Sequence, residues 1–415
     1  MMDRKLKFIQ YFGFITAGMV GTLIAPLLPE VRTALGLTYS QVGAVLSAQS
    51  IGTLIAALAG GYAADRFGKK SALLAGSASL LLGLLLIVLA RSFAPAFLSM
   101  ICIGTGFGVY QVAINALCAD TSGTNKGAAM NRLHVFYGLG AICGPVLSAL
   151  LLGQMSWRTI FAVSSIAPLV MIGALFLIRI PGLGSTPCPD PASASTATAA
   201  STAAPASALT PVAISDKRSA PKQARFHWYG GSFLLLTGLI LFFYVGLEVS
   251  VFGWLPSFWD SLTWANAFPP ALTSGVFWLS LTIGRLIAGR ISDRLGFGKF
   301  LMGACLASAV LALSWWAVQG GLPALLLIFV LGMAMGGIFP TAMVSVISQY
   351  PGRTATVSGT MSLIASFGGL IVPAAVGRVA DQGGISVLPA AIAIVTLALF
   401  LASVVTWVPR LARRR

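Results

Sequence analysis

Glu248 lies deep inside a long apolar run, FFYVGLEVSVFGW, and Tyr244 precedes it by four residues. On a helix the two side chains would share a face and reach each other. A carboxylate at the centre of a membrane costs a few kcal/mol, so such a residue faces other helices and has a partner or a proton. The chemistry open to Glu248 is solute binding or proton carriage. The alternative is a structural hydrogen bond to a neighbouring helix.

Two other sets of polar residues follow helical spacing. Gln111 and Asn115 share a face, and their amides suit hydroxyl-rich ligands, with hydrogen bonding between helices as the structural alternative. Trp278, Thr282 and Arg285 form one stripe at i, i+4 and i+7. A tryptophan beside polar groups suits a sugar ring, whereas Arg285 could hold a carboxylate with both nitrogens. The structural alternative for Arg285 is snorkelling to the membrane surface or pairing with a loop aspartate.

A third set of polar residues lies near the start of a separate apolar run and consists of Asn131, His134 and Tyr137. These residues too could bind a solute or form hydrogen bonds between helices. We expect His134 near the cytoplasmic mouth of a solute pathway.

The composition predicts a membrane protein. Of 415 residues, 57% are hydrophobic and 9% are charged, and the mean hydropathy is +0.91, whereas a soluble domain is about a quarter charged. The net charge of +16 comes from basic residues scattered between apolar runs, which argues against nucleic-acid binding and indicates membrane topology. The five cysteines have no paired spacing, so we expect neither disulfides nor a metal site.

Twelve apolar runs have about the 20 residues that a helix needs to cross the hydrocarbon core. We therefore predict an all-α membrane protein with twelve transmembrane helices in two pseudo-symmetric six-helix halves. The expected spans are 8–29, 41–64, 71–90, 95–118, 132–154, 159–179, 229–255, 269–289, 300–319, 323–348, 356–380 and 385–408. The first run is too long for a signal peptide and is expected to be retained.

Lysine and arginine concentrate in alternate gaps between the runs, which places both termini and the loop after the sixth run in the cytoplasm. Residues 181–228 are rich in Ala, Ser, Thr and Pro, so we predict a flexible cytoplasmic linker there. It separates an N-terminal half at 1–180 from a C-terminal half at 229–415.

The halves repeat with an offset of 228 residues. GYAADRFG matches GRISDRLG, and GLGAICGP matches GGLIVP. The matching pairs are Gly61 and Gly289, Asp65 and Asp293, Arg66 and Arg294, Gly68 and Gly296, Gly140 and Gly368, and Pro145 and Pro373. Two like-oriented six-helix halves are the parallel repeat of one class of secondary transporters.

On these residues the chain resembles the major facilitator superfamily. GYAADRFGKK at 61–70 is similar to the signature cytoplasmic loop between its second and third helices, and the copy at 289–296 is similar to the loop between helices eight and nine. NRLHVFYGLGAICGP, GLEVSVFGWLPSFW and FWLSLTIGRLIAGRISDRLG resemble its fucose-permease-like branch. That branch uses acids on helices one and four, where this chain has Gln10, Gln111 and Asn115, which argues against fucose as the substrate.

The resemblance implies a gate. Asp65 would face the N-terminus of the eleventh helix, and Gly61 would allow close backbone approach. The implied gating residues are Gly61, Asp65, Arg66, Gly68, Lys69, Gly289, Asp293, Arg294 and Gly296. The alternative is a positive-inside anchor with a turn at Gly68. Gly140, Gly144 and Pro145 also partly match a glycine-rich motif of drug/proton antiporters, for which packing between helices is the simpler reason.

We therefore expect a secondary active transporter that moves a sugar or similar polyhydroxylated solute by alternating access, with protons carried by Glu248. The alternatives are a proton-coupled efflux antiporter for drugs or metabolites and an organic-anion transporter that acts through Arg285. Without HExxH, GxSxG or Walker A patterns, we expect no enzyme. The expected partners are a small-molecule substrate, protons and the lipid bilayer, with no nucleic acid, cofactor or metal. We expect a monomer in a plasma membrane, the inner membrane of a bacterium.

Overall fold

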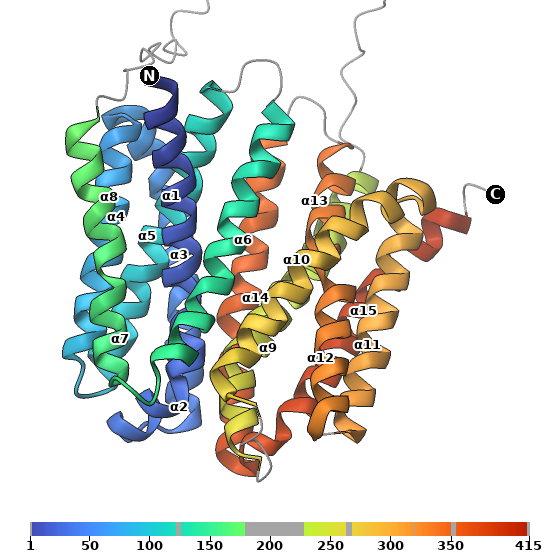
Figure 1. Ribbon diagram of the computed structural model, residues 1–415. Helices are drawn as coiled ribbons and strands as arrows, with labels where there is room; N and C mark the ends of the chain where they lie inside the picture. Colours follow the sequence, from blue (N-terminus) through green and yellow to red (C-terminus); the bar gives the residue numbers. More distant parts are fainter. Residues whose placement is uncertain are drawn as a thin grey trace, which may run out of the picture.

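The computed structural model describes residues 2–121, 126–178, 228–262, 268–318, 320–349 and 354–412. These residues are almost entirely helical, and each of the twelve expected spans coincides with one helix or with two consecutive helices (Figure 1). The helices are α1 Met2–Thr22, α2 Ile24–Leu35, α3 Tyr39–Phe67, α4 Lys69–Leu89, α5 Phe93–Thr121, α6 Lys126–Leu151, α7 Trp157–Ser164, α8 Ile166–Leu177, α9 Trp228–Asp260, α10 Pro270–Leu295, α11 Phe297–Ala317, α12 Gly321–Gly336, α13 Ile338–Ile347, α14 Thr354–Gly383 and α15 Leu388–Ala412, with a short 3-10 helix at Ile385–Val387. The predicted fold class is confirmed.

The outer faces of the helices are apolar, as a bilayer requires. Ten stretches of the described residues are long and apolar enough to cross a membrane, and α6 adds a shorter apolar part at Val135–Leu151. Large apolar side chains such as Leu89, Leu177 and Ile394 are largely exposed, which suits contact with lipid tails. Several helices extend beyond the predicted spans, since their polar ends continue past the hydrocarbon.

Proline breaks three of the twelve spans. A proline ring inside a helix clashes with the carbonyl four residues earlier and removes one hydrogen bond. Pro26, Pro168 and Pro340 each lie four residues after the last residue of a helix, namely of α1, α7 and α12. The first, sixth and tenth spans are therefore each built from two helices.

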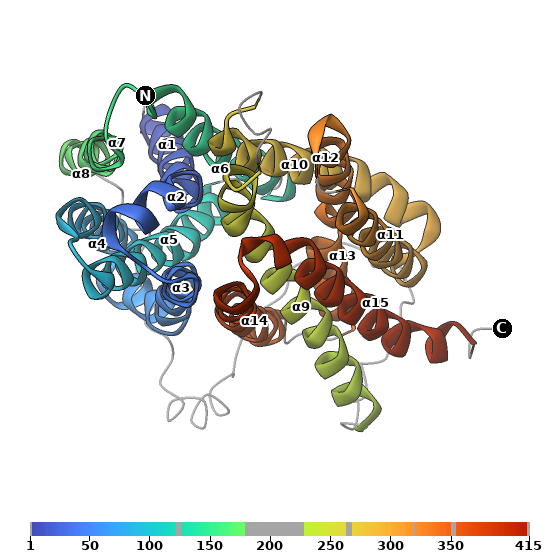
Figure 2. The ribbon, with the colours of Figure 1, turned by 90° about the horizontal axis from the view of Figure 1, so that it is seen from below.

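The helices form two groups, α1 to α8 and α9 to α15, which lie side by side (Figures 1 and 2). The groups meet where α3 packs on α14, α6 on α10 and α2 on α9. Helix α1 begins and α15 ends at the same end of the bundle, here called the proximal end, at the top of Figure 1. The opposite end is the distal end. Most of the predicted linker, 179–227, lies outside the described residues, and the domain boundaries stay a prediction.

The 228-residue repeat is also visible in the helix packing. In the first group, a Cβ atom at Gly140 of α6 would overlap the backbone carbonyl of Ile15 in α1. In the second group, a Cβ atom at Gly368 of α14 would overlap the carbonyl of Phe242 in α9. Two glycines 228 residues apart thus allow the same close helix contact in both groups. Gly144 also lies against α1, so close packing between helices accounts for Gly140 and Gly144.

The paired loops share a turn. Gly68 ends α3 with φ 85° and ψ 152°, and Gly296 ends α10 with φ 80° and ψ 150°. Only glycine adopts this backbone region without strain. Both copies of the loop therefore reverse the chain at one residue. A turn at Gly68 is compatible with the gate and with the positive-inside anchor alike.

Candidate functional site

An ion pair joins α9 and α10. Nη2 of Arg285 donates a hydrogen bond of 2.9 Å to Oε1 of Glu248, and the Tyr244 hydroxyl donates one of 3.3 Å to the same oxygen. The expected partner of Glu248 is present, and Arg285 pairs with this intramembrane acid instead of a loop aspartate. The side chains of Arg285 and Glu248 are 36% and 15% exposed. Both side chains of the pair therefore keep some accessible surface.

Trp278 lies beside this ion pair on the predicted stripe. Its ring centroid is 5.8 Å from the guanidinium carbon of Arg285, a distance that allows a cation–π interaction. Among the described residues, its buried Nε1 donor has no hydrogen-bond partner. The Thr282 hydroxyl, by contrast, donates to the carbonyl of Trp278 at 2.8 Å, so its proton is used within α10. The stripe therefore offers an aromatic face and one free donor.

Aromatic rings connect this stripe to the first group of helices. Tyr137 of α6 meets Trp278 edge-on at 5.9 Å, and Phe107 of α5 lies 5.8 Å from Tyr137. Phe252 of α9 approaches Trp278 from within the second group, at 6.1 Å. Tyr137 also interacts electrostatically with both members of the ion pair. No pattern in the sequence singled out Phe107 or Phe252, because an aromatic residue in an apolar run resembles ordinary packing.

Gln111 and Asn115 contact each other on α5. Nδ2 of Asn115 lies 3.5 Å from Oε1 of Gln111, a long hydrogen bond, and Oδ1 of Asn115 is buried without a partner in the part of the chain that the structure describes. Gln111 follows Phe107 by one helical turn, so the amide pair continues the face that reaches Tyr137. The described contacts link the amides to the ion pair only through these rings. The side chains of Asn131 and His134 lie outside the described residues.

The sequence model of the Major Facilitator Superfamily matches residues 11–373 and 271–415. The chain belongs to the Major Facilitator Superfamily. It is 22% identical to a glucose/mannose transporter of Bacillus subtilis over 92% of this chain and 89% of that protein. It is 26% identical to a 3-(3-hydroxy-phenyl)propionate transporter of Escherichia coli over 64% of this chain and 59% of that protein. Its fold matches the crystal structure of a D-xylose-proton symporter with a TM-score of 0.75 and 14% identity, covering 98% of each chain.

The signature loop of this superfamily member is described in part. Nζ of Lys70 donates to the carbonyl of Ile178 at 3.2 Å, just after α8 ends, where a cation is favourable. Arg66 and Arg294 are exposed, and a Cβ atom at Gly289 would meet nothing within 4 Å. Arg66 and Lys69 both have partners. The side chains of Asp65 and Asp293 and the surroundings of Gly61 lie outside the described residues.

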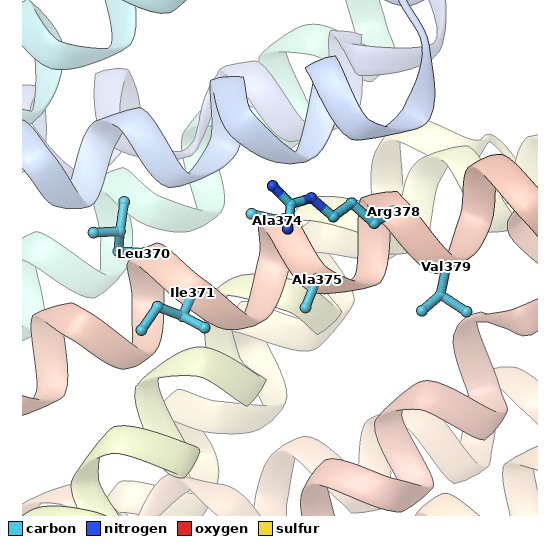
Figure 3. A pocket seen from close by; sticks show the side chains of 6 residues that line it. All are labelled: Leu370, Ile371, Ala374, Ala375, Arg378 and Val379. Carbon is cyan, nitrogen blue, oxygen red and sulfur yellow. The ribbon is translucent and has the colours of Figure 1, made fainter.

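A groove of about 540 Å³ runs along α14 of the transporter (Figure 3). Two rows at four-residue spacing line it: Leu370, Ala374 and Arg378, and Ile371, Ala375 and Val379. Apart from Arg378 the lining is apolar, and Ile371 and Val379 are about half exposed. None of the residues predicted to bind the solute lines this groove.

Proposed function

We propose that this transporter moves a sugar or similar polyhydroxylated solute by alternating access, coupled to protons through Glu248. The observation that carries the proposal is the Glu248–Arg285 pair beside Trp278, near the seam between the two groups of helices. When the carboxylate of Glu248 takes up a proton it loses its ion-pair partner. The charge of the site then changes while the carboxyl group stays in place. The solute would occupy the space between the halves, as in other transporters with parallel repeats.

A neutral solute fits the charges of this site. Arg285 is compensated by Glu248, so the pair offers donors and acceptors but no net charge. The face of Trp278 suits a sugar ring, its free Nε1 can donate to a hydroxyl, and the free Oδ1 of Asn115 can accept from one. The similarity to a glucose/mannose transporter supports the same class of solute.

The coupling assignment predicts the behaviour of Glu248→Gln. In liposomes loaded with purified protein, a panel of radiolabelled sugars is followed with and without an inward proton gradient. We expect the wild type to accumulate at least one sugar only when the gradient is present. Glu248→Gln should lose this accumulation, because glutamine cannot take up and release the proton, yet should keep sugar exchange between the two sides.

Glu30→Gln provides the matched control, since it removes a carboxylate from α2 and leaves the ion pair intact. It should accumulate sugar as the wild type does. Equal gradient-driven accumulation by wild type and Glu248→Gln would show that the coupling group is elsewhere. If no sugar moved while lipophilic cations exchanged for protons, the protein would be an efflux antiporter.

An organic anion is the second candidate solute. Protonation of Glu248 would free Arg285 to bind a carboxylate, with Trp278 beside it to hold an aromatic ring. The similarity to a 3-(3-hydroxy-phenyl)propionate transporter supports this reading. Aromatic acids therefore belong in the same liposome panel, and their proton-driven accumulation without any sugar transport would favour this candidate.

The gate at the signature loop remains part of the proposal. Asp65→Asn should lower turnover while expression is largely retained, because the variant loses the charge that would stabilise one conformation. Asp120→Asn, which removes a carboxylate from the proximal end of α5, is the control and should transport normally. Equal turnover in wild type and Asp65→Asn would refute the gate.

The distribution of lysine and arginine supports a cytoplasmic proximal end, with both termini inside the cell. We accordingly propose a monomer in the inner membrane of a bacterium, with the distal end facing outward.

A further inference from the structure

Asp381 of α14 contacts the N-terminus of α3 at the distal end of the bundle. Its Oδ1 accepts a hydrogen bond of 2.6 Å from the backbone N–H of Tyr39, and its Oδ2 accepts one of 3.0 Å from that of Ser40. Tyr39 and Ser40 belong to the first group of helices and Asp381 to the second. A single carboxylate thus bridges the seam with both of its oxygens.

Asp381 completes a helix cap that the first group leaves unfinished. The first N–H groups of a helix have no partner within it. In α3, Oγ1 of Thr38 accepts from the N–H of Gln41, and Oε1 of Gln41 accepts from the N–H of Thr38. This capping box leaves the N–H groups of Tyr39 and Ser40 without a partner among the described residues of the first group of helices. These are the two groups that donate to Asp381.

The surrounding contacts make this the point where the two groups close. The guanidinium carbon of Arg32 lies 3.8 Å from the Tyr39 ring centroid, and Arg32 also attracts Asp381 electrostatically. A Cβ atom at Gly43 would lie 2.7 Å from the carbonyl oxygen of Pro373, so the backbones of α3 and α14 touch one turn further in. The Nε1 of Trp254 donates to the same carbonyl at 3.3 Å.

We propose that Asp381 is a latch that holds the distal side of the transporter closed and must release whenever that side opens. If α3 separated from α14, the N–H groups of Tyr39 and Ser40 would lose the carboxylate and bind water instead. The charged carboxylate therefore favours the closed state. Asp381 is exposed, which keeps the contact weak enough to break in every cycle. The latch rests on alternating access, as in the proposed function, but on neither the solute nor the proton.

A cysteine on α3 reports the opening. Ser47 is 2% exposed and lies between Gly43 and Ser50, on the face that meets α14. Ser47→Cys is placed in a background where the five native cysteines are replaced by serine, and the protein is put in nanodiscs so that both faces meet a polar maleimide. Labelling is followed without solute, so the result does not depend on what the protein carries.

We expect Asp381→Ala to raise the labelling rate about two- to fivefold, as loss of a carboxylate from an exposed helix N-terminus would. Ser40→Pro should act similarly, because it removes the backbone N–H and the side-chain hydroxyl that Ser40 offers to Asp381, and proline is tolerated in the first turn of a helix. The double variant should label about as fast as the faster single variant. Its rate should not reach the product of the two single effects, since both substitutions break the same contact. Asp260→Asn, which removes an exposed carboxylate from the distal end of α9, is the control and should not raise the labelling rate, since Asp260 repels Glu30 of the first group.

Labelling at the parent rate in monodisperse Asp381→Ala would overturn the latch. If Asp381→Ala does not fold, Ser40→Pro decides alone, because it keeps the carboxylate and the rest of the cap. A rise in Asp260→Asn equal to that in Asp381→Ala would also overturn it, because the effect would then come from the surface charge of the distal end. Failure of every solute in the liposome panel, with these labelling rates as expected, would refute the proposed function and leave the latch standing.

Discussion

Arg285→Leu should destabilise the protein more than Glu248→Gln, and the double variant should be more stable than the sum of the two effects predicts. Arg285→Leu leaves the Glu248 carboxylate without its counter-charge and with only the Tyr244 hydroxyl as a described donor, whereas the amide introduced by Glu248→Gln would still accept a hydrogen bond from Arg285. Breaking a fully buried pair costs about 3 to 5 kcal/mol. Here we expect about 2 kcal/mol for Arg285→Leu, because water partly screens a guanidinium that is 36% exposed.

The measurement is the temperature at which half of the protein loses monodisperse elution in detergent, for wild type, both single variants and the double variant. A positive coupling, with the double variant close to Glu248→Gln, would show that the two charges stabilise each other. Additive shifts would show that the hydrogen bond of 2.9 Å contributes nothing to stability. Glu30→Gln serves again as the control for loss of one carboxylate.

Gly140→Ala and Gly368→Ala should both destabilise the helix bundle. Each methyl group would overlap a backbone carbonyl, of Ile15 in one group and of Phe242 in the other. A backbone atom cannot rotate away as a side chain does, so the two helices must separate. Overpacking of this kind typically costs about 1 to 3 kcal/mol, which should lower the midpoint of thermal inactivation by several degrees in each variant.

Gly303→Ala is the matched control for these two variants. Gly303 lies within α11, is exposed, and a Cβ atom there would meet nothing within 4 Å. Its replacement should leave the midpoint unchanged or raise it slightly, since alanine favours a helix more than glycine does. Equal midpoints for Gly140→Ala, Gly368→Ala and Gly303→Ala would contradict the repeated close contact.

The sequence predicted what depends on composition and on local spacing. The spans follow from apolar runs, and the paired turns at Gly68 and Gly296 follow from a repeat that places glycine where only glycine fits. The breaks at Pro26, Pro168 and Pro340 could not be predicted in this way. A proline removes the hydrogen bond to the carbonyl four residues earlier, yet α6, α9 and α14 each contain a proline and continue through it.

The contacts between helices could not be predicted in the same way. Glu248 and Arg285 are 37 residues apart, and their meeting depends on how α9 and α10 are rotated against each other. One hint existed, since a deep acid and a deep base each need a partner. The contact of Asp381 with α3 could not be predicted from the sequence, because an aspartate near a helix end looks like any surface residue until the position of α3 is known.

The unbroken length of α3 has a mechanical consequence. This helix runs for 29 residues without a break and touches α14 closely at Gly43, four residues from its distal end and 24 from its proximal end. At a rise of about 1.5 Å per residue, a stiff rod that pivots there has arms of about 6 and 36 Å. A movement of about 1 Å at Tyr39 would then become about 6 Å at Phe67, in the opposite direction. A rigid α3 that pivoted at this contact would act as a lever, in which a small displacement at one membrane surface produces a large one at the other.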